Sequence, residues 1–181
     1  EQLVVDELDI GQGKLNIGCR THTTLKDEDY ETLLVYNGIL GGFPHSKLFV
    51  NVREKASLAY YAVSRLESHK GMLIMMSGIE VDSFDQAVDI MKKQLNMMRD
   101  GEISETELNQ TKASLVNQLL EIKDNARTII DFAYNGRLSG THKTLEQVLE
   151  KLIQVTLQDV VAIAEKIEID TIYFLRDKEG K

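Results

Sequence analysis

The chain has 181 residues, of which 43% are hydrophobic and 28% are charged, so it is long enough for one domain with a sizeable core. The formal net charge is −8, the sequence pI is about 5.1, and the Lys and Arg residues are scattered among acids. Nucleic-acid binding, which depends on neutralising phosphates, is therefore not expected. No apolar run reaches the ~20 residues that cross a bilayer, and no signal-peptide pattern opens the chain. We expect a cytoplasmic protein without a membrane partner.

The first segments of the chain differ in their regularity. Residues 1–12 alternate only loosely between apolar and polar side chains, so we expect a lead-in or linker there. Lys14–Thr21 alternates strictly, which predicts a strand with one buried face. Cys19 lies on the apolar side of that strand, and no other cysteine is present to pair with it. We therefore expect Cys19 to be a buried, inert thiol in a reducing compartment.

The next stretch, Leu33–Tyr61, combines an apolar helix with a glycine break. We expect Asp27 to cap a helix that runs to Leu40 and ends at two consecutive glycines, Gly41 and Gly42. Ser46–Lys55 then has helical spacing of its apolar residues.

Two strands follow as a hairpin. The patterns of Ser57–Leu66 and Met72–Ile79 predict strands that are joined by a turn near Ser68–Gly71. The second strand is apolar on both faces, which favours a position inside the sheet.

The chain is mainly helical after this hairpin. In a capping box, the side chains of the first and fourth residues each accept a hydrogen bond from the other's backbone N–H. We expect such boxes at Ser83 with Gln86, Ser104 with Glu107 and Thr156 with Asp159. We place the later helices at Ala126–Leu138, Thr144–Ile153 and Thr156–Ile167, with Gly101 and Gly140 at helix ends and a closing strand at Thr171–Arg176. The order of elements predicts one α+β domain over residues 1–181. It is a two-layer sandwich in which a mainly antiparallel sheet of about four or more strands packs against helices.

The sequence offers no catalytic metal site. The histidines are His22, His45, His69 and His142, and neither His-Glu-x-x-His nor its inverse His-x-x-Glu-His occurs. We interpret all four as exposed loop residues and expect this chain to bind no metal. The acidic pair Glu105 and Glu107 is interpreted as helix capping and solvation rather than as catalytic carboxylates.

Arg53 and Tyr60 are the strongest candidates for a site. Arg53 lies near the end of a short predicted helix, and Tyr60 lies seven positions later at the start of a predicted strand. Both side chains could therefore face one cleft. A forked guanidinium and a phenol hydroxyl are donors suited to a peptide carbonyl or a developing oxyanion. On spacing alone, a structural role is favoured over a functional one, with Arg53 paired to a surface acid and Tyr60 packed in the core.

The residues around this pair resemble a known family. The matching motifs are Gly41-Gly42, Ser46-Lys47-Leu48-Phe49, Arg53-Glu54-Lys55 and Leu58-Ala59-Tyr60. They are similar to the C-terminal domain of the pitrilysin-like zinc metallopeptidases, which include insulin-degrading enzyme and mitochondrial processing peptidase. The similarity extends over nearly the whole chain and is greatest to small Gram-positive bacterial members. One departure is Ser57, where the family usually has glycine.

The resemblance implies a role in peptide hydrolysis. Members of this family have two similar halves that close around a peptide, and the N-terminal half carries His-x-x-Glu-His and the zinc. The C-terminal half contributes an arginine and a tyrosine that contact the substrate and the tetrahedral intermediate. By motif position these are Arg53 and Tyr60. The zinc ligands have no counterpart here, so zinc is expected in the N-terminal half of the same protein or in a paralogous subunit.

Three hypotheses follow for the function. The first is a C-terminal, substrate-binding half of a zinc metallopeptidase, with an extended peptide added to a sheet edge. The second is a non-catalytic subunit that completes the chamber of an active partner. The third is an unrelated α+β interaction domain in which the motif match is accidental.

Overall fold

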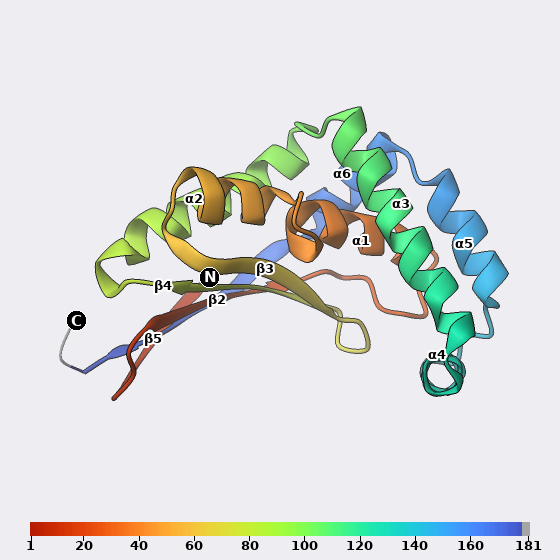
Figure 1. Ribbon diagram of the computed structural model, residues 1–181, viewed down its shortest axis with the longest axis horizontal. Coiled ribbons are helices and arrows are strands. Elements are labelled where there is room, and N and C mark those ends of the chain that lie inside the picture. Colours follow the sequence, from red (N-terminus) through yellow and green to blue (C-terminus); the bar gives the residue numbers. More distant parts are fainter. Residues whose placement is uncertain (179–181) are drawn as a thin grey trace.

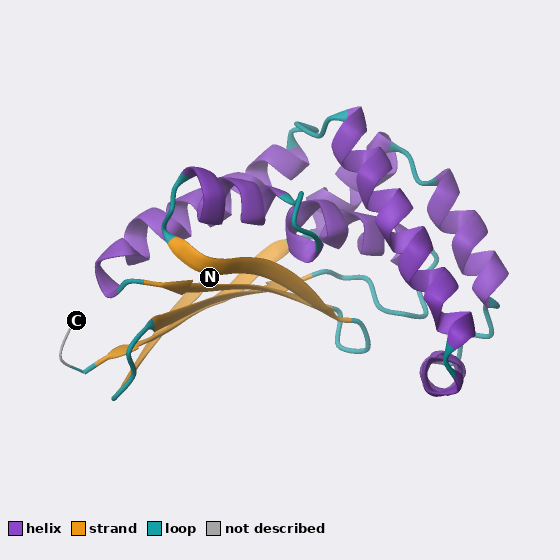
Figure 2. Ribbon diagram, viewed as in Figure 1, coloured by secondary structure: helices purple, strands orange, loops and turns teal. Residues whose placement is uncertain are grey.

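The computed structural model describes residues 1–178 and contains a five-stranded sheet. The strands lie in the order β1-β5-β2-β4-β3. Their bounds are Gln2–Leu8 for β1, Gly13–Arg20 for β2, Ala59–Glu67 for β3, Met72–Ile79 for β4 and Glu168–Asp177 for β5. β1 pairs in parallel with β5, whereas the other neighbours are antiparallel. Helices cover one face of the sheet (Figures 1 and 2). The predicted two-layer α+β fold is confirmed.

The helical layer begins beside the sheet and extends past its end (Figure 1). The α-helices are α1 (Tyr30–Asn37), α2 (Phe84–Arg99), α3 (Glu105–Glu121), α4 (Ala126–Ser139), α5 (Leu145–Gln154) and α6 (Leu157–Lys166). Two wider, π-helical segments, η1 (Gly38–Gly42) and η2 (Phe49–Lys55), lie between α1 and β3. Single 3₁₀ turns are found at η3 (Val81–Ser83) and η4 (Ile122–Asp124). Among the described residues, no helix is long and apolar enough to cross a membrane.

The core lies between the sheet and the helices, as the alternation in the second strand predicts. Leu15, Ile17 and Cys19 of β2 are completely buried. Burial raises the pKa of the Cys19 thiol to about 12, so the thiol stays protonated at neutral pH. Its predicted burial is confirmed, and low reactivity follows because only the thiolate is a strong nucleophile.

Local signals in the helical half are mostly confirmed. The capping boxes at Ser104 and Thr156 are both formed. The one expected at Ser83 is wrong: Ser83 ends a 3₁₀ turn, and its φ of −90° and ψ of 3° keep its hydroxyl from the cap position. Asp27 likewise does not cap α1, which begins after Asp29. The Asp27 carboxylate instead accepts hydrogen bonds from the backbone N–H and hydroxyl of Thr24, both at 2.7 Å.

The expected lead-in over residues 1–12 is also wrong, because most of it is strand β1. This strand pairs with β5 along its whole length, from Gln2 opposite Thr171 to Leu8 opposite Asp177. β1 occupies the edge of the sheet, and 58% of Leu3 and 44% of Val5 are exposed. The loose alternation of residues 1–12 fits this edge position, because a strand whose side chains are mostly exposed does not need one apolar face.

Candidate functional site

The segment from Gly38 to β3 is held tightly against the sheet. A Cβ atom on Gly41 would lie 2.4 Å from the backbone nitrogen of Ser64 and 2.8 Å from Leu48 Cδ1. Only glycine therefore allows η1 to approach β3 this closely. The Ser64 hydroxyl completes the contact by donating a 2.8 Å hydrogen bond to the side-chain carbonyl of Asn37. Gly41 thus fixes where η1, and the chain that follows it, lies against the sheet.

Lys47 anchors the next part of the segment to the helical layer. Its side chain is only 4% exposed, and its ammonium donates to the Glu102 carbonyl at 2.6 Å and to Glu107 Oε1 at 2.9 Å. Burial raises the pKa of Glu107, but hydrogen bonds from Ser104 and Lys47 outweigh that effect, and the pKa is lowered overall. Glu107 is therefore a charged structural group, as its interpretation as a capping residue predicts.

Arg53 is exposed near the end of η2. Its guanidinium lies over the ring of Phe49, 4.5 Å from the ring centre. Within residues 1–178 it makes no hydrogen bond or ion pair, so the pairing with a surface acid is not found. All of its donors are available to a ligand.

Ser57 connects η2 to β3 in a conformation that glycine adopts more easily. Its φ is +53°, in the left-handed region, and its hydroxyl donates a 3.4 Å hydrogen bond to the Glu54 carbonyl. The family's usual glycine at this position therefore has a physical reason: the chain must reverse into β3 here.

Replacing Ser57 with glycine is expected to stabilise the protein by up to about 1 kcal/mol, because it relieves the left-handed strain. Urea denaturation of both proteins measures the change. Ala56→Gly is the matched control: Ala56 has φ −83°, so glycine there should lower stability. A loss of stability in Ser57→Gly would show that Ser57 is not strained.

Tyr60 lies at a bulge in strand β3. The pairing with β4 shifts between Ala59, opposite Ile79, and Tyr61, opposite Gly78, so Tyr60 is an extra residue. The Tyr60 side chain is 66% exposed and donates a 3.1 Å hydrogen bond to Glu80 Oε1. That hydrogen bond and the negative charge of Glu80 raise the pKa of Tyr60, so its hydroxyl stays protonated and able to donate. Tyr60 is not a core residue.

The structure therefore brings Arg53 and Tyr60 to the exposed junction of η2 and β3, two elements that pack together. Neither residue lines the large cavity of the molecule, which lies at the other end of β3. Sequence reasoning missed Glu80, the partner of Tyr60. The hairpin register was a usable signal, because counting back from the turn near Ser68–Gly71 places residue 60 opposite residue 79, the neighbour of Glu80.

The described residues do not fit a zinc site. No three His, Cys, Asp or Glu side chains come together in residues 1–178 as metal ligands would. Three of the histidines are exposed, whereas His45 is half-buried, stacked on Phe43 and hydrogen-bonded to Thr111 at 3.1 Å. The interpretation of His45 as an exposed loop residue is wrong, since its ring packs against α3.

Comparison of the sequence and the fold with known proteins shows the protein family of this chain. The family described as "Peptidase M16 inactive domain" matches residues 1–115. The "Probable inactive metalloprotease YmfF" of Bacillus subtilis is 51% identical over 98% of this chain and 42% of its own length. The "Uncharacterized zinc protease YmxG" of the same organism is 30% identical over 75% of this chain and 34% of its own length. A conserved protein from Enterococcus faecalis has the same fold, with a TM-score of 0.93 at 36% identity over 98% of this chain and 42% of its own.

The fold and these relatives define a non-catalytic half of a zinc-protease architecture. The chain belongs to the peptidase M16 family, as a member of its inactive domains. This confirms the resemblance found in the sequence and excludes an accidental motif match. The chain spans less than half the length of the relatives it matches.

Proposed function

We propose that this chain is the substrate-binding half of a zinc-dependent peptidase. It helps to close a peptide chamber and orients the substrate, while an N-terminal half of the same protein holds the zinc and hydrolyses the peptide. The observation that carries this proposal is the pair of exposed donors, Arg53 and Tyr60, at the positions where the family motif has them. The cytoplasm is the compartment we propose.

The two donors suit different parts of the reaction. The Arg53 guanidinium is permanently charged and presents a fork that binds a carbonyl or a developing oxyanion. The Tyr60 hydroxyl has one hydrogen, which it donates to Glu80 in this structure. To bind a substrate carbonyl, it has to exchange the Glu80 oxygen for the substrate oxygen. Glu80 therefore keeps the phenol protonated and oriented until a peptide arrives.

Strand β3 offers a place for the peptide itself. β3 is the last strand in the order β1-β5-β2-β4-β3, so its outer edge carries backbone groups with no strand partner among the described residues. An extended peptide can add to such an edge through backbone hydrogen bonds that do not depend on its sequence. Tyr60 lies at the start of this edge.

A second candidate function is a non-catalytic, chamber-forming subunit. The relative from Bacillus subtilis that is 51% identical favours it, because that protein is named an inactive metalloprotease. In that case the chain would bind peptide and complete the chamber of an active partner, without a zinc-bearing half of its own.

Peptide hydrolysis by the full-length protein tests the proposal. An internally quenched, unstructured peptide should be cleaved by the full-length protein, and a chelator should abolish cleavage. Cleavage only after addition of a paralogous subunit would favour the second candidate. The absence of peptide binding by fluorescence anisotropy in every assembly would overturn both.

A further inference from the structure

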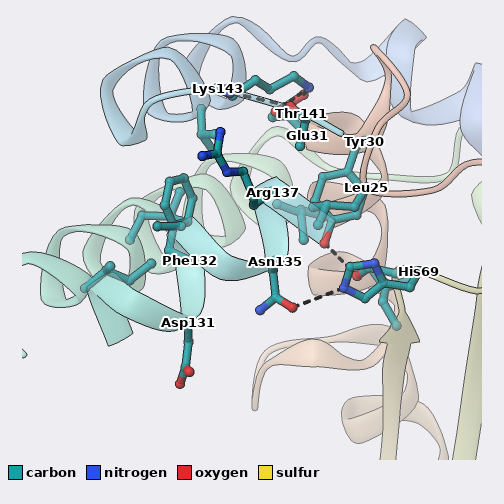
Figure 3. Close-up of a pocket in the computed structure, with 18 of the residues that line it drawn as sticks. Leu25, Tyr30, Glu31, His69, Asp131, Phe132, Asn135, Arg137, Thr141 and Lys143 are labelled. Carbon is teal, nitrogen blue, oxygen red and sulfur yellow. Dashed lines mark hydrogen bonds and ion pairs between the residues drawn. The ribbon is translucent and has the colours of Figure 1, made fainter. Parts of the chain in front are cut away.

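A large cavity lies away from the proposed peptide site. It has a volume of about 950 Å³, within the upper range of small-molecule sites, and opens between helix α4 and the body of the protein. Its lining includes β3 from Arg65 onward and Ser68 of the β3–β4 turn, whereas Tyr60 lies near the other end of β3, roughly 17 Å from Arg65 along the strand. Figure 3 shows α4 forming one wall.

The walls of the cavity carry apolar side chains that the protein itself buries only in part. Six hydrophobic side chains from α1, β3, α3, η4, α4 and α5 contribute, namely Leu34, Leu66, Leu119, Ile122, Phe132 and Val148. All but Val148 are half-buried, so they keep apolar surface open to the cavity. A ligand with an apolar body would remove that surface from water.

Helix α4 is attached to the body at few points. None of its residues is buried. Apart from the local bonds of Thr128 to the Ile122 and Asn125 carbonyls, the side chains of α4 bond the rest of residues 1–178 only through His69, whose ring contacts Asn135 and Ser139 at 3.1 Å each. Figure 3 shows the contact with Asn135. The inner face of α4, including Phe132, therefore lacks the packing that a helix in a domain normally has. A molecule between α4 and the body would supply it.

The acids and bases that line the cavity are equal in number, but they differ in whether they have a partner. Glu31 is neutralised by Lys143, whose ammonium donates to both carboxylate oxygens at 2.9 and 3.0 Å, and Asp131 pairs with Arg127. Arg137 lies between Phe132 and the Lys143–Glu31 pair, and its guanidinium has no hydrogen bond or ion pair within the described part of the chain (Figure 3). Arg65 and Glu67 belong to the rim, because they alternate to the sheet face opposite Leu66.

We propose that this cavity binds an apolar monocarboxylate, with the carboxylate on Arg137 and the aliphatic body between Phe132 and the wall opposite. A guanidinium binds a carboxylate through two parallel hydrogen bonds, which an alcohol of the same length cannot form. This site is independent of the proposed peptide site and needs no metal.

Titration of the full-length protein with octanoate and decanoate, below their micellar concentrations, tests the proposal by calorimetry. We expect saturable binding to one site and a threefold to fourfold gain in affinity per added methylene. Decanol, which has the same apolar body without the charge, should bind at least tenfold more weakly. The α4 amides should exchange hydrogen more slowly when decanoate is bound.

Arg137→Gln should weaken decanoate binding about tenfold and leave decanol binding unchanged. Lys93→Gln is the control, since Lys93 of α2 is exposed, forms no hydrogen bond or ion pair within residues 1–178 and lies outside the cavity lining. Its affinity should equal that of the unchanged protein. Non-saturable binding, equal affinity for decanol and decanoate, or the same loss in both variants would overturn the proposal.

Discussion

Replacing Arg53 with alanine is expected to lower kcat/KM for peptide hydrolysis by about 100-fold or more in an assembly with an active zinc-binding half. The guanidinium has no partner in residues 1–178 apart from the Phe49 ring, so its removal disturbs little of the fold. The loss should fall mainly on kcat, because the charge it stabilises develops in the transition state. Steady-state kinetics with an internally quenched peptide measures it.

Lys55→Ala provides the matched control for this variant. Lys55 lies on the same short helix, is exposed, and forms no hydrogen bond or ion pair in the described chain, so the same charge is removed two residues away. Its kinetics should stay within about twofold of the unchanged protein. Unchanged turnover in Arg53→Ala would remove Arg53 from the site.

The second large effect concerns Gly41, where alanine is expected to destabilise the protein by about 3 kcal/mol. Its Cβ would lie 2.4 Å from the backbone nitrogen of Ser64, and a paired strand cannot retreat as a flexible side chain can. The corresponding fall in Tm is about 6–12 °C for a domain of this size. Thermal denaturation followed by circular dichroism measures it.

The adjacent glycine tests whether this cost comes from contact rather than from loss of glycine. A Cβ on Gly42 would lie 3.2 Å from the Asn37 carbonyl oxygen and 3.3 Å from its side-chain nitrogen, distances that small shifts relieve. Gly42→Ala should therefore cost about 1 kcal/mol or less. Equal melting temperatures in the two variants would show that η1 can move away from β3.

The parts of the fold that the sequence predicts correctly are those encoded locally. The alternation of Lys14–Thr21 and the capping box at Ser104 each depend on residues close together in the chain. Strand β1 was missed because its partner β5 lies roughly 170 residues away. The cap at Ser83 failed because a preceding 3₁₀ turn fixes its backbone, which the Ser-x-x-Gln pattern does not reveal.

The candidate site divides in the same way. Arg53 and Tyr60 are recognisable from the motif, but their spacing alone gives neither the bulge at Tyr60 nor its hydrogen bond to Glu80. The cavity could not be predicted, because its walls come from elements distributed from Leu25 to Val148. Only the three-dimensional arrangement shows that Arg137 has no hydrogen-bond or ion-pair partner among residues 1–178.

The pairing of β1 with β5 also has a consequence for synthesis on the ribosome. β2, β4 and β3 can pair as soon as residue 79 has emerged, but β1 has no partner until residues 168–177 are made. At ~5–20 residues per second, the wait after β1 lasts roughly 8 to 35 s. Throughout that time Leu3 and Val5 are exposed on an unpaired strand. Such a strand can pair with another chain and aggregate, which a chaperone would prevent. β1 is thus the first strand of the sheet to be translated and the last to be paired.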